Sequence, residues 1–244
     1  MLLAVDIGNA NIKFGIFDGD DLISRFSLPT DATPAALTAG LRANIASPIR
    51  DSIICSVVPE MNEALVGTLR QLTDAEPLLV RNDLDLGLSV DYDPLDSLGT
   101  DRLVNAFAAS AKYSTPCIVC SFGTATTIDV VSEARFRGGL IAPGLNVLSR
   151  ALHLSTSRLP DITLQQPATP IQNSTTGAIN AGVTYGYVAM VEGLISRMRA
   201  ASGDDAAVIG TGGSLPLVAR FVDHADENLL LDGLRLLHRR LYPE

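Results

Sequence analysis

The feature of this sequence that most restricts its fold is a strand-turn-strand pattern that occurs twice, 115 residues apart. In residues 5–12 and again in residues 120–127, an apolar strand enters a turn at a small polar residue, a glycine follows two positions later, and a second strand leaves after Asn or Thr. The two turns read Asp6-Ile7-Gly8-Asn9 and Ser121-Phe122-Gly123-Thr124. Repetition of one supersecondary unit indicates two related halves. We therefore predict that each half opens with a strand-turn-strand unit.

The rest of the chain predicts mixed sheets covered by helices. Apolar runs of strand type occur at 2–5, 12–17, 22–27, 52–57, 78–80, 117–120, 126–131, 136–141, 207–209 and 229–231. Helical spacing of apolar residues occurs at 34–45, 61–72, 101–113, 145–152, 175–200 and 215–222. Because the strands come both in hairpin clusters and in alternation with helices, mixed sheets are favoured over an all-parallel doubly wound fold. Seven Phe, five Tyr and no Trp, against 20 Gly and 13 Pro, predict an aliphatic core with many turns.

The charge and hydropathy patterns exclude several classes of function. The formal net charge is −9 and no basic run is present, so the cation clusters that bind nucleic acid or anionic membranes are missing. No segment has the roughly 18 uninterrupted apolar residues of a membrane span, and the first residues lack the basic and apolar regions of a signal peptide. We expect a cytoplasmic protein that binds neither nucleic acid nor membrane and that holds phosphate through backbone N–H groups and a few side chains.

The two repeated turns are candidate phosphate sites. A glycine next to Asn or Thr in a tight turn exposes N–H groups, and such concave nests bind phosphate oxygens. The sequence has no Walker A motif and no G-x-G-x-x-G between a strand and a helix, so P-loop and Rossmann folds are not supported. Lys13 lies on the strand that leaves the first turn, where it either reaches the phosphates or is a solvated strand residue. Asp6 enters the turn from an apolar strand, where it either meets a partner such as hydrated Mg²⁺ or caps its own backbone in an Asx-turn.

Two further clusters carry polar residues beside apolar elements. Gly99-Thr100-Asp101-Arg102 precedes an apolar helical run. Thr100 or Asp101 could be a helix N-cap, or Asp101 could accept a proton from a hydroxyl while Arg102 holds an anionic substrate. Residues 209–214 place three glycines between a strand and a helix, which fits either close approach to a nucleoside or a tight connection.

Together these motifs resemble those of type III pantothenate kinases, members of the superfamily of acetate and sugar kinases, Hsp70 and actin. Asp6-Ile7-Gly8-Asn9 is similar to the family's D-x-G-N-T phosphate loop. The other signatures follow in the family's order over essentially the whole chain: Ser56-Val57-Val58-Pro59, Tyr92 with residues 99–102, residues 123–127, residues 138–144, Gly182 to Gly193, and Thr211-Gly212-Gly213.

The resemblance implies a fold, a reaction and an assembly. The fold would be α/β, with two ribonuclease-H-like halves of the actin-like ATPase type at 1–114 and 115–244, mixed sheets with helices, and a nucleotide cleft between the halves. The reaction would be ATP-dependent phosphorylation of pantothenate to 4'-phosphopantothenate, the first step of coenzyme A biosynthesis. The protein would be a homodimer that completes the pantothenate pocket across the subunit interface.

The resemblance also implies a role for each matching residue. Asp101 would be the general base that deprotonates the pantothenate hydroxyl. ATP and its phosphates would be bound by Asp6, Gly8, Asn9, Asn11, Lys13, Gly123 and Thr124. Pantothenate would be bound by Tyr92, Gly99, Thr100, Arg102 and Thr176. Asp6 would reach Mg²⁺ through water, and the family's monovalent cation, K⁺ or NH₄⁺, would lie at the position of Ser121.

Two positions in the phosphate loops depart from the family pattern. Ala10 replaces a Thr and removes a hydroxyl donor, while Ser121 replaces the cation-binding Asp with a neutral ligand. These changes bear on ATP affinity, on cation dependence and on activity itself. An alternative function is therefore a catalytically impaired homologue that binds ligands or regulates, as some relatives are called Bvg accessory factors. A third is a kinase for another small hydroxylated acid.

Overall fold

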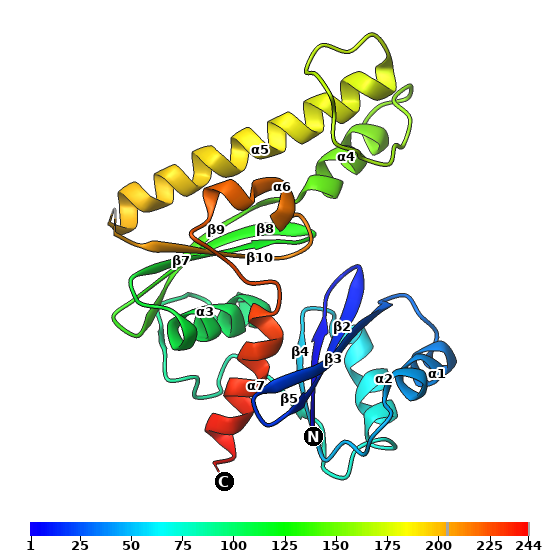
Figure 1. Ribbon diagram of the computed structural model, residues 1–244, viewed down its shortest axis with the longest axis vertical. Helices are drawn as coiled ribbons and strands as arrows, with labels where there is room; N and C mark the ends of the chain where they lie inside the picture. Colours follow the sequence, from blue (N-terminus) through cyan, green and yellow to red (C-terminus); the bar gives the residue numbers. More distant parts are fainter. Residues whose placement is uncertain (204, 244) are drawn as a thin grey trace. The chain divides into compact units, whose positions relative to one another are not determined.

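A computed structural model describes residues 1–203 and 205–243, which form two compact units (Figure 1). The first unit holds residues 1–112 together with the C-terminal segment that begins at Asn228, and the second holds residues 113–227. In the order of the chain, the second unit is therefore an insertion between two helices of the first.

The first unit is built on a five-stranded mixed sheet with the strand order β3-β2-β1-β4-β5. Its strands are β1 (Leu2–Ile7), β2 (Asn11–Asp18), β3 (Asp21–Pro29), β4 (Asp51–Ser56) and β5 (Leu78–Leu79). Neighbours among the first three strands are antiparallel, whereas β4 runs parallel to β1 and β5 parallel to β4. Leu3, Ala4 and Val5 are fully buried, so β1 is covered on both faces, as central strands of helix-covered sheets are.

Helices cover both faces of this sheet. α1 (Pro34–Asn44) and α2 (Pro59–Leu69) contribute Leu37, Leu41, Leu65 and Leu69 to a core that they share with β1 and β2. α3 (Thr100–Lys112) and α7 (Leu229–Leu241) lie side by side on the other face (Figure 1). The short strand β6 (Ser89–Val90) and the 3-10 turn η1 (Leu95–Ser97) lie in the connection that leads to α3.

The position and type of α7 correct two expectations. Residues 229–231 were expected to form a strand, which is wrong because they are the first turn of α7. Three consecutive apolar residues fit a buried strand or a helix equally well, and the helical period becomes clear only with the buried Leu234 and Leu237. By its contacts α7 also belongs with the first unit, although the expected second half ran to residue 244. Gly233 permits this packing, since a Cβ there would lie 2.9 Å from the carbonyl oxygen of Val104.

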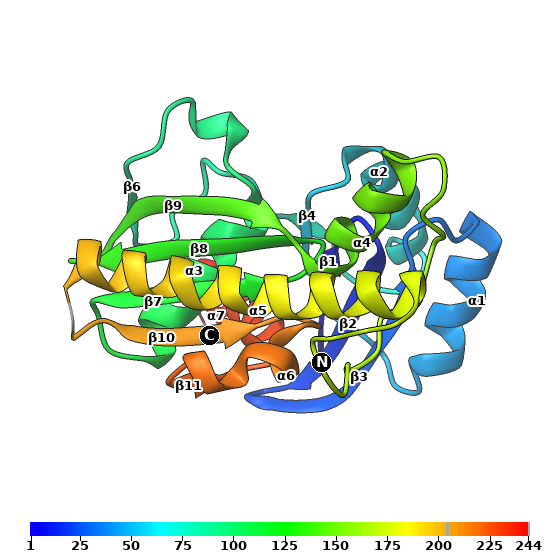
Figure 2. The ribbon, with the colours of Figure 1, turned by 90° about the horizontal axis from the view of Figure 1, so that it is seen from above.

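The second unit contains five strands in the order β11-β10-β7-β8-β9. They are β7 (Cys117–Phe122), β8 (Ala125–Ser132), β9 (Arg135–Pro143), β10 (Ala207–Thr211) and β11 (His224–Ala225). Its helices are α4 (Leu145–Leu154), α5 (Thr175–Ser202) and α6 (Leu215–Val218), followed by the 3-10 turn η2 (Ala219–Phe221). The long helix α5 runs along one face of these strands (Figure 2), where Tyr187, Val191 and Ile195 pack against Cys120 and Ile128.

The two units repeat one strand order, β3-β2-β1-β4 in the first and β9-β8-β7-β10 in the second. In each, the opening strand is followed by an antiparallel hairpin and has a parallel neighbour on its other side. The predictions of mixed sheets and of a strand-turn-strand unit at the start of each half are therefore confirmed. Within the described residues, no helix combines the length and the apolar character needed to cross a membrane.

Candidate active site

The turn between β1 and β2 leaves two backbone amides available for an anion. The N–H of Gly8 donates to the carbonyl of Asn11 at 3.1 Å, so it closes the turn. Thr30 holds the opposite side, because its hydroxyl donates to the carbonyl of Gly8 at 2.6 Å and its N–H donates to that of Ala10 at 3.2 Å. The N–H groups of Asn9 and Ala10 have no acceptor in the described part of the chain, and both residues are exposed. These two amides, rather than that of Gly8, can bind an oxyanion.

The corresponding turn of the second unit is built in the same way. The N–H of Gly123 donates to the carbonyl of Ala125 at 3.1 Å, and the carbonyl of Thr124 accepts from the N–H of Gly144 at 3.0 Å. The exposed Thr124 keeps its N–H and its hydroxyl without a partner among the described residues. A Cβ at Gly144 would collide with the carbonyl oxygens of Gly123 and Thr124, so only glycine permits this support.

The third glycine cluster is a tight connection. Gly212 has φ +98°, and a Cβ on it would lie 2.7 Å from the carbonyl carbon of Phe122 at the end of β7. The N–H of Ser214 donates to the carbonyl of Phe122 at 3.0 Å. The cluster therefore fixes β10 and α6 to the end of the strand that carries Ser121, which supports the second of its two interpretations.

Asp6 and Lys13 form an ion pair beside the first turn. They are register partners in the antiparallel pair of β1 and β2, and Lys13 Nζ lies 3.5 Å from an Asp6 carboxylate oxygen. Asp6 is only 7% exposed. Burial raises the pKa of Asp6 to about 6, against the lowering effect of Lys13 and with a further raising effect from Asp101. The two carboxylates and the lysine therefore share one electrostatic environment within the first unit.

Asp101 stands in the first turn of α3 and does not act as an N-cap. Its carboxylate accepts from the N–H of Arg102 at 2.9 Å, and a Cβ at Gly99 would lie 2.5 Å from the same oxygen. Gly99 thus provides the space that this carboxylate occupies. Burial raises the pKa of Asp101, although the Arg102 N–H and guanidinium oppose the shift. A carboxyl group whose pKa is raised in this way is suited to accept a proton near neutral pH.

Arg102 and Tyr92 come together next to Asp101. The Arg102 guanidinium donates to the Tyr92 hydroxyl at 3.3 Å and lies 5.4 Å from the centre of the tyrosine ring. Arg102 is 4% exposed, so its charge is largely shielded from solvent. A shielded guanidinium is suited to hold an anionic substrate group.

Thr100 is held by a network that the sequence did not reveal. Its hydroxyl donates to the carbonyl of Ser56 at 3.0 Å, and the Cys55 thiol lies 3.4 Å from the same hydroxyl. Burial, with Asp6 and Asp101 nearby, raises the pKa of Cys55, so the thiol stays protonated and can donate. The start of α3 is thereby fixed to the end of β4, directly before Asp101.

We expect Thr100→Val to lower kcat about 10-fold, because it removes the bond to Ser56 that positions Asp101. The KM for the acceptor should change little, and Thr100→Ser should retain most of the activity. Steady-state kinetics of both variants would check this. A raised KM at unchanged kcat would show instead that Thr100 binds the substrate directly.

An open groove of about 860 Å³ runs along the carboxyl ends of β4 and β5, where parallel strands commonly bind ligands. Gly99 and Thr100 line one part of it. Asn82 stiffens its wall, since the side-chain amide donates to the carbonyls of Leu95 at 2.8 Å and Leu98 at 2.7 Å. The groove gives a small molecule access to the first turn of α3.

The remaining predicted residues are Asn11 in the first unit and Ser121 and Thr176 in the second. Asn11 is exposed at the start of β2. Ser121 lies near the end of β7, opposite Thr127, and the buried Asp129 pairs two positions further along with Val119. Thr176 is exposed in the first turn of α5, where Ser174 accepts from the N–H of Gly177. Among the described residues, no three His, Cys, Asp or Glu side chains gather as a metal site would require.

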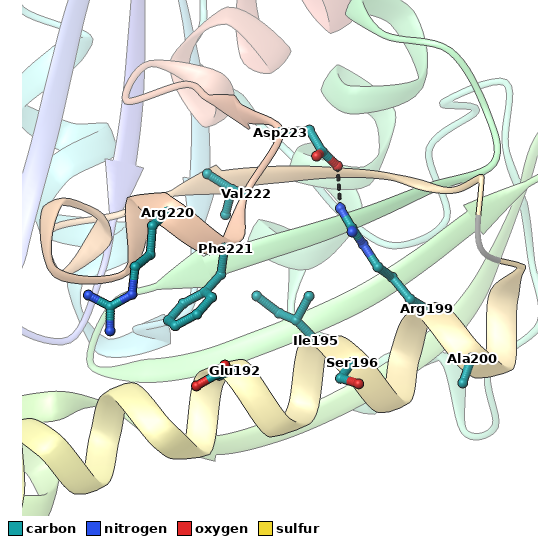
Figure 3. A pocket seen from close by; sticks show the side chains of 9 residues that line it. All are labelled: Glu192, Ile195, Ser196, Arg199, Ala200, Arg220, Phe221, Val222 and Asp223. Carbon is teal, nitrogen blue, oxygen red and sulfur yellow. Dashed lines mark hydrogen bonds and ion pairs between the residues drawn. The ribbon is translucent and has the colours of Figure 1, made fainter.

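A second hollow, of about 460 Å³, lies between α5 and residues 220–223 of the second unit (Figure 3). Arg199 and Asp223 face each other there in an ion pair of 2.6 Å, and Asp223 also accepts from the N–H of Val208 at 2.8 Å. None of the predicted site residues lines this hollow, and two of its four charged side chains, Arg199 and Asp223, are bound to each other.

Comparisons with known proteins agree on one family. The sequence profile of the type III pantothenate kinase family matches residues 2–197. The type III pantothenate kinase of Paramagnetospirillum magneticum is 39% identical, over 98% of this chain and 97% of that protein. The corresponding enzyme of Rhodospirillum rubrum is 40% identical over the full length of both chains.

Solved structures of low identity share the fold. A protein of Campylobacter jejuni named as a Baf family transcriptional activator matches with a TM-score of 0.61 and 20% identity, over 98% of each chain. Component A of the (R)-2-hydroxyglutaryl-CoA dehydratase of Acidaminococcus fermentans matches with a TM-score of 0.54 and 11% identity, over 99% of this chain and 96% of that one. The fold is thus α/β with two mixed sheets, of the actin-like ATPase type.

Proposed function

The chain belongs to the type III pantothenate kinase family, and from this premise we propose that Asp101 is the general base of its reaction. The protein is a phosphotransferase that phosphorylates pantothenate, the first step of coenzyme A biosynthesis. The assignment of Asp101 rests on one observation: its carboxyl group has a raised pKa and belongs to the residue next to the shielded Arg102. No other carboxylate in the described part of the first unit combines these features.

Asp101 takes the proton from the pantothenate hydroxyl as that oxygen bonds to the γ-phosphorus of ATP. The bond between the γ-phosphorus and the bridging oxygen breaks, and ADP leaves with that electron pair. Arg102 and Tyr92 hold the anionic acceptor, and Gly99 keeps the space around the base open. Thr100 acts mainly by fixing the start of α3, because its hydroxyl is bonded to Ser56.

ATP is the phosphoryl donor, as the kinase family implies. We assign its phosphates to the loop amides that have no acceptor within the protein, those of Asn9 and Ala10 in the first unit and that of Thr124 in the second. Lys13 adds a positive charge beside the first of these loops. Gly8 and Gly123 shape the turns, and Asn11 is an exposed donor at the start of β2.

The residues present fit a magnesium ion but not the family's monovalent cation site. Mg²⁺ commonly keeps its waters and uses one or two carboxylates plus phosphate oxygens, and Asp6 supplies one such carboxylate. When bound with ATP, the ion supplies positive charge to the phosphates. Ser121 offers only a neutral hydroxyl, and the buried Asp129 pairs with Val119 rather than with Phe122 or the loop. The chain therefore lacks the carboxylate on which the K⁺ site of the family depends.

Large apolar side chains of the second unit are available for contact with a second copy of the chain. Ile141, Leu154 and Ile171 are 62%, 69% and 86% exposed. Thr176 follows them in the chain, in the exposed first turn of α5. We assign these residues to a homodimer interface through which Thr176 contributes to the pantothenate pocket.

A coupled assay of ADP release tests the proposed function. We expect turnover that requires both ATP and pantothenate, measured in parallel with K⁺, NH₄⁺ or Na⁺ as the sole monovalent cation. If calorimetry showed that ATP or pantothenate binds while no cation supported turnover, the chain would be an impaired homologue with a binding or regulatory role.

We expect Ser121→Asp to raise turnover in K⁺ or NH₄⁺ about 10-fold, because it restores a negative cation ligand near the second loop. The same variant should gain little in Na⁺. Ser121→Asn, which is similar in size but neutral, is the matched control and should behave like the parent. An equal gain for Asp and Asn would rule out the cation explanation.

A further inference from the structure

Asn105 is a buried amide without a partner in the described part of the chain, one helical turn beyond Asp101. It is 4% exposed in the middle of α3. Its side-chain oxygen is buried and accepts no hydrogen bond, and no hydrogen bond of its amide group is found among the described residues. Its neighbours in the chain, Val104 and Ala106, are buried and apolar, and so are Ala108 and Ala109 one turn further along the helix. An apolar side chain would suit this position better if packing alone decided it.

A buried amide that forms no hydrogen bond destabilises the folded state, because it loses water and gains nothing in return. Such groups occur in native proteins mainly where a water or a ligand supplies the missing hydrogen bond. Arg102, on the same helix and equally buried, does have a protein partner in Tyr92. The missing partner of Asn105 is therefore expected to be a group that the chain itself does not supply.

The position on the helix says where this group lies. Residues four apart on an α-helix lie on one face, with Cβ atoms about 5–6 Å apart. Helical side chains lean toward the N-terminus, so we expect the amide of Asn105 to lie over the turn that contains Asp101. A molecule whose hydroxyl contacts Asp101 would bring its neighbouring polar group to Asn105.

We propose that the side-chain oxygen of Asn105 accepts a hydrogen bond from the second hydroxyl of pantothenate, beside the hydroxyl that is phosphorylated. This inference rests on the proposed role of Asp101. Pantothenate carries its two hydroxyls on carbons separated by a single carbon, so neighbouring side chains can bind both at once. Asn105 would then select acceptors that have this pair of hydroxyls.

The test combines an enzyme variant with a substrate analogue. Asn105→Leu keeps a similar volume and removes the amide, and the analogue of pantothenate without the second hydroxyl removes its partner. We expect the variant to lose about 10- to 100-fold in kcat/KM for pantothenate, with the KM for ATP unchanged and the melting temperature equal or higher. The loss should nearly vanish with the deoxy analogue, because variant and analogue remove the same contact.

Several results would overturn the proposal. Unchanged kcat/KM in a stabilised Asn105→Leu variant would mean that the amide has no partner in the working enzyme. A loss of equal size with both acceptors would place the contact elsewhere. If the Leu variant did not fold, Asn105→Ser would replace it. Independently, equal kcat/KM of the parent enzyme for pantothenate and the deoxy analogue would exclude the contact.

Ser52 supplies a matched control. It is 2% exposed on β4, its hydroxyl also has no partner among the described residues, and it pairs with Leu3 near the start of the strand. Ser52→Ala should leave the kinetics unchanged with both acceptors. If Asp101 is not the general base, turnover will survive in Asp101→Asn. That result is independent of the kinetics of the Asn105 variants, so the two proposals can fail separately.

Discussion

Asp101→Asn should lower kcat by about 10²- to 10⁴-fold, the range that a positioned general base contributes. The amide keeps the size of the side chain and can still accept from the N–H of Arg102, but it cannot take a proton. Binding of ATP and pantothenate, measured by calorimetry, should therefore remain close to that of the parent. A loss confined to kcat would separate proton transfer from substrate binding.

The pH profile gives an independent check of the same residue. Because burial raises the pKa of Asp101, kcat/KM of the parent should fall as the pH is lowered through that raised value. The residual activity of the Asn variant should not show this acidic limb. Asp18→Asn, at an exposed carboxylate at the end of β2, is the control for a simple change in charge. Substantial turnover in Asp101→Asn would exclude Asp101 as the base.

Asp6→Asn should stabilise the protein at neutral pH while lowering turnover by about 10²-fold or more. The folded pKa of Asp6 is about 6, whereas its ordinary value is 3.8, so the native state keeps the proton to higher pH than the unfolded state does. The stability of the parent should therefore decrease as the pH rises from about 4 to above 6. The Asn variant has no buried charge at this position. Its free energy of unfolding should therefore exceed that of the parent by about 2–3 kcal/mol at pH 7 to 8 and equal it below about pH 4.

Urea unfolding of both proteins without metal, at several pH values, would check this difference. Turnover should fall because the carboxylate that would hold the waters of Mg²⁺ is gone. A variant less stable than the parent at pH 8 would mean that the ion pair with Lys13 outweighs the burial of Asp6.

The sequence predicted the parts of the site that depend on local order. The strand-turn-strand repeat located both loops and placed Lys13 on the strand that leaves the first turn, where the structure makes it the register partner of Asp6. The cluster at residues 99–102 was located as well, although Thr100 is not the N-cap, because it is itself the first residue of α3. Such features follow from residues that are near neighbours in the chain.

Contacts between residues far apart in the chain could not be predicted from the sequence in this way. Thr30 supports a loop that lies 22 residues earlier, and Cys55 contacts a residue 45 positions later. No periodic pattern marks either one, because each is a single polar residue placed by the packing of distant elements. Asn105 was hidden for another reason, since one polar residue in an apolar helical run is equally consistent with a solvent-exposed position.

The insertion of the second unit between α3 and α7 sets the order in which the chain can mature on the ribosome. The side of α3 that packs against Gly233 stays uncovered until α7 has emerged, long after β1 has been made. Residues 113–227 form a contiguous stretch and can fold as soon as they leave the exit tunnel. The unit that contains Asp101 is completed only when α7 has emerged, so a chain that stops before Leu229 would lack a helix of that unit.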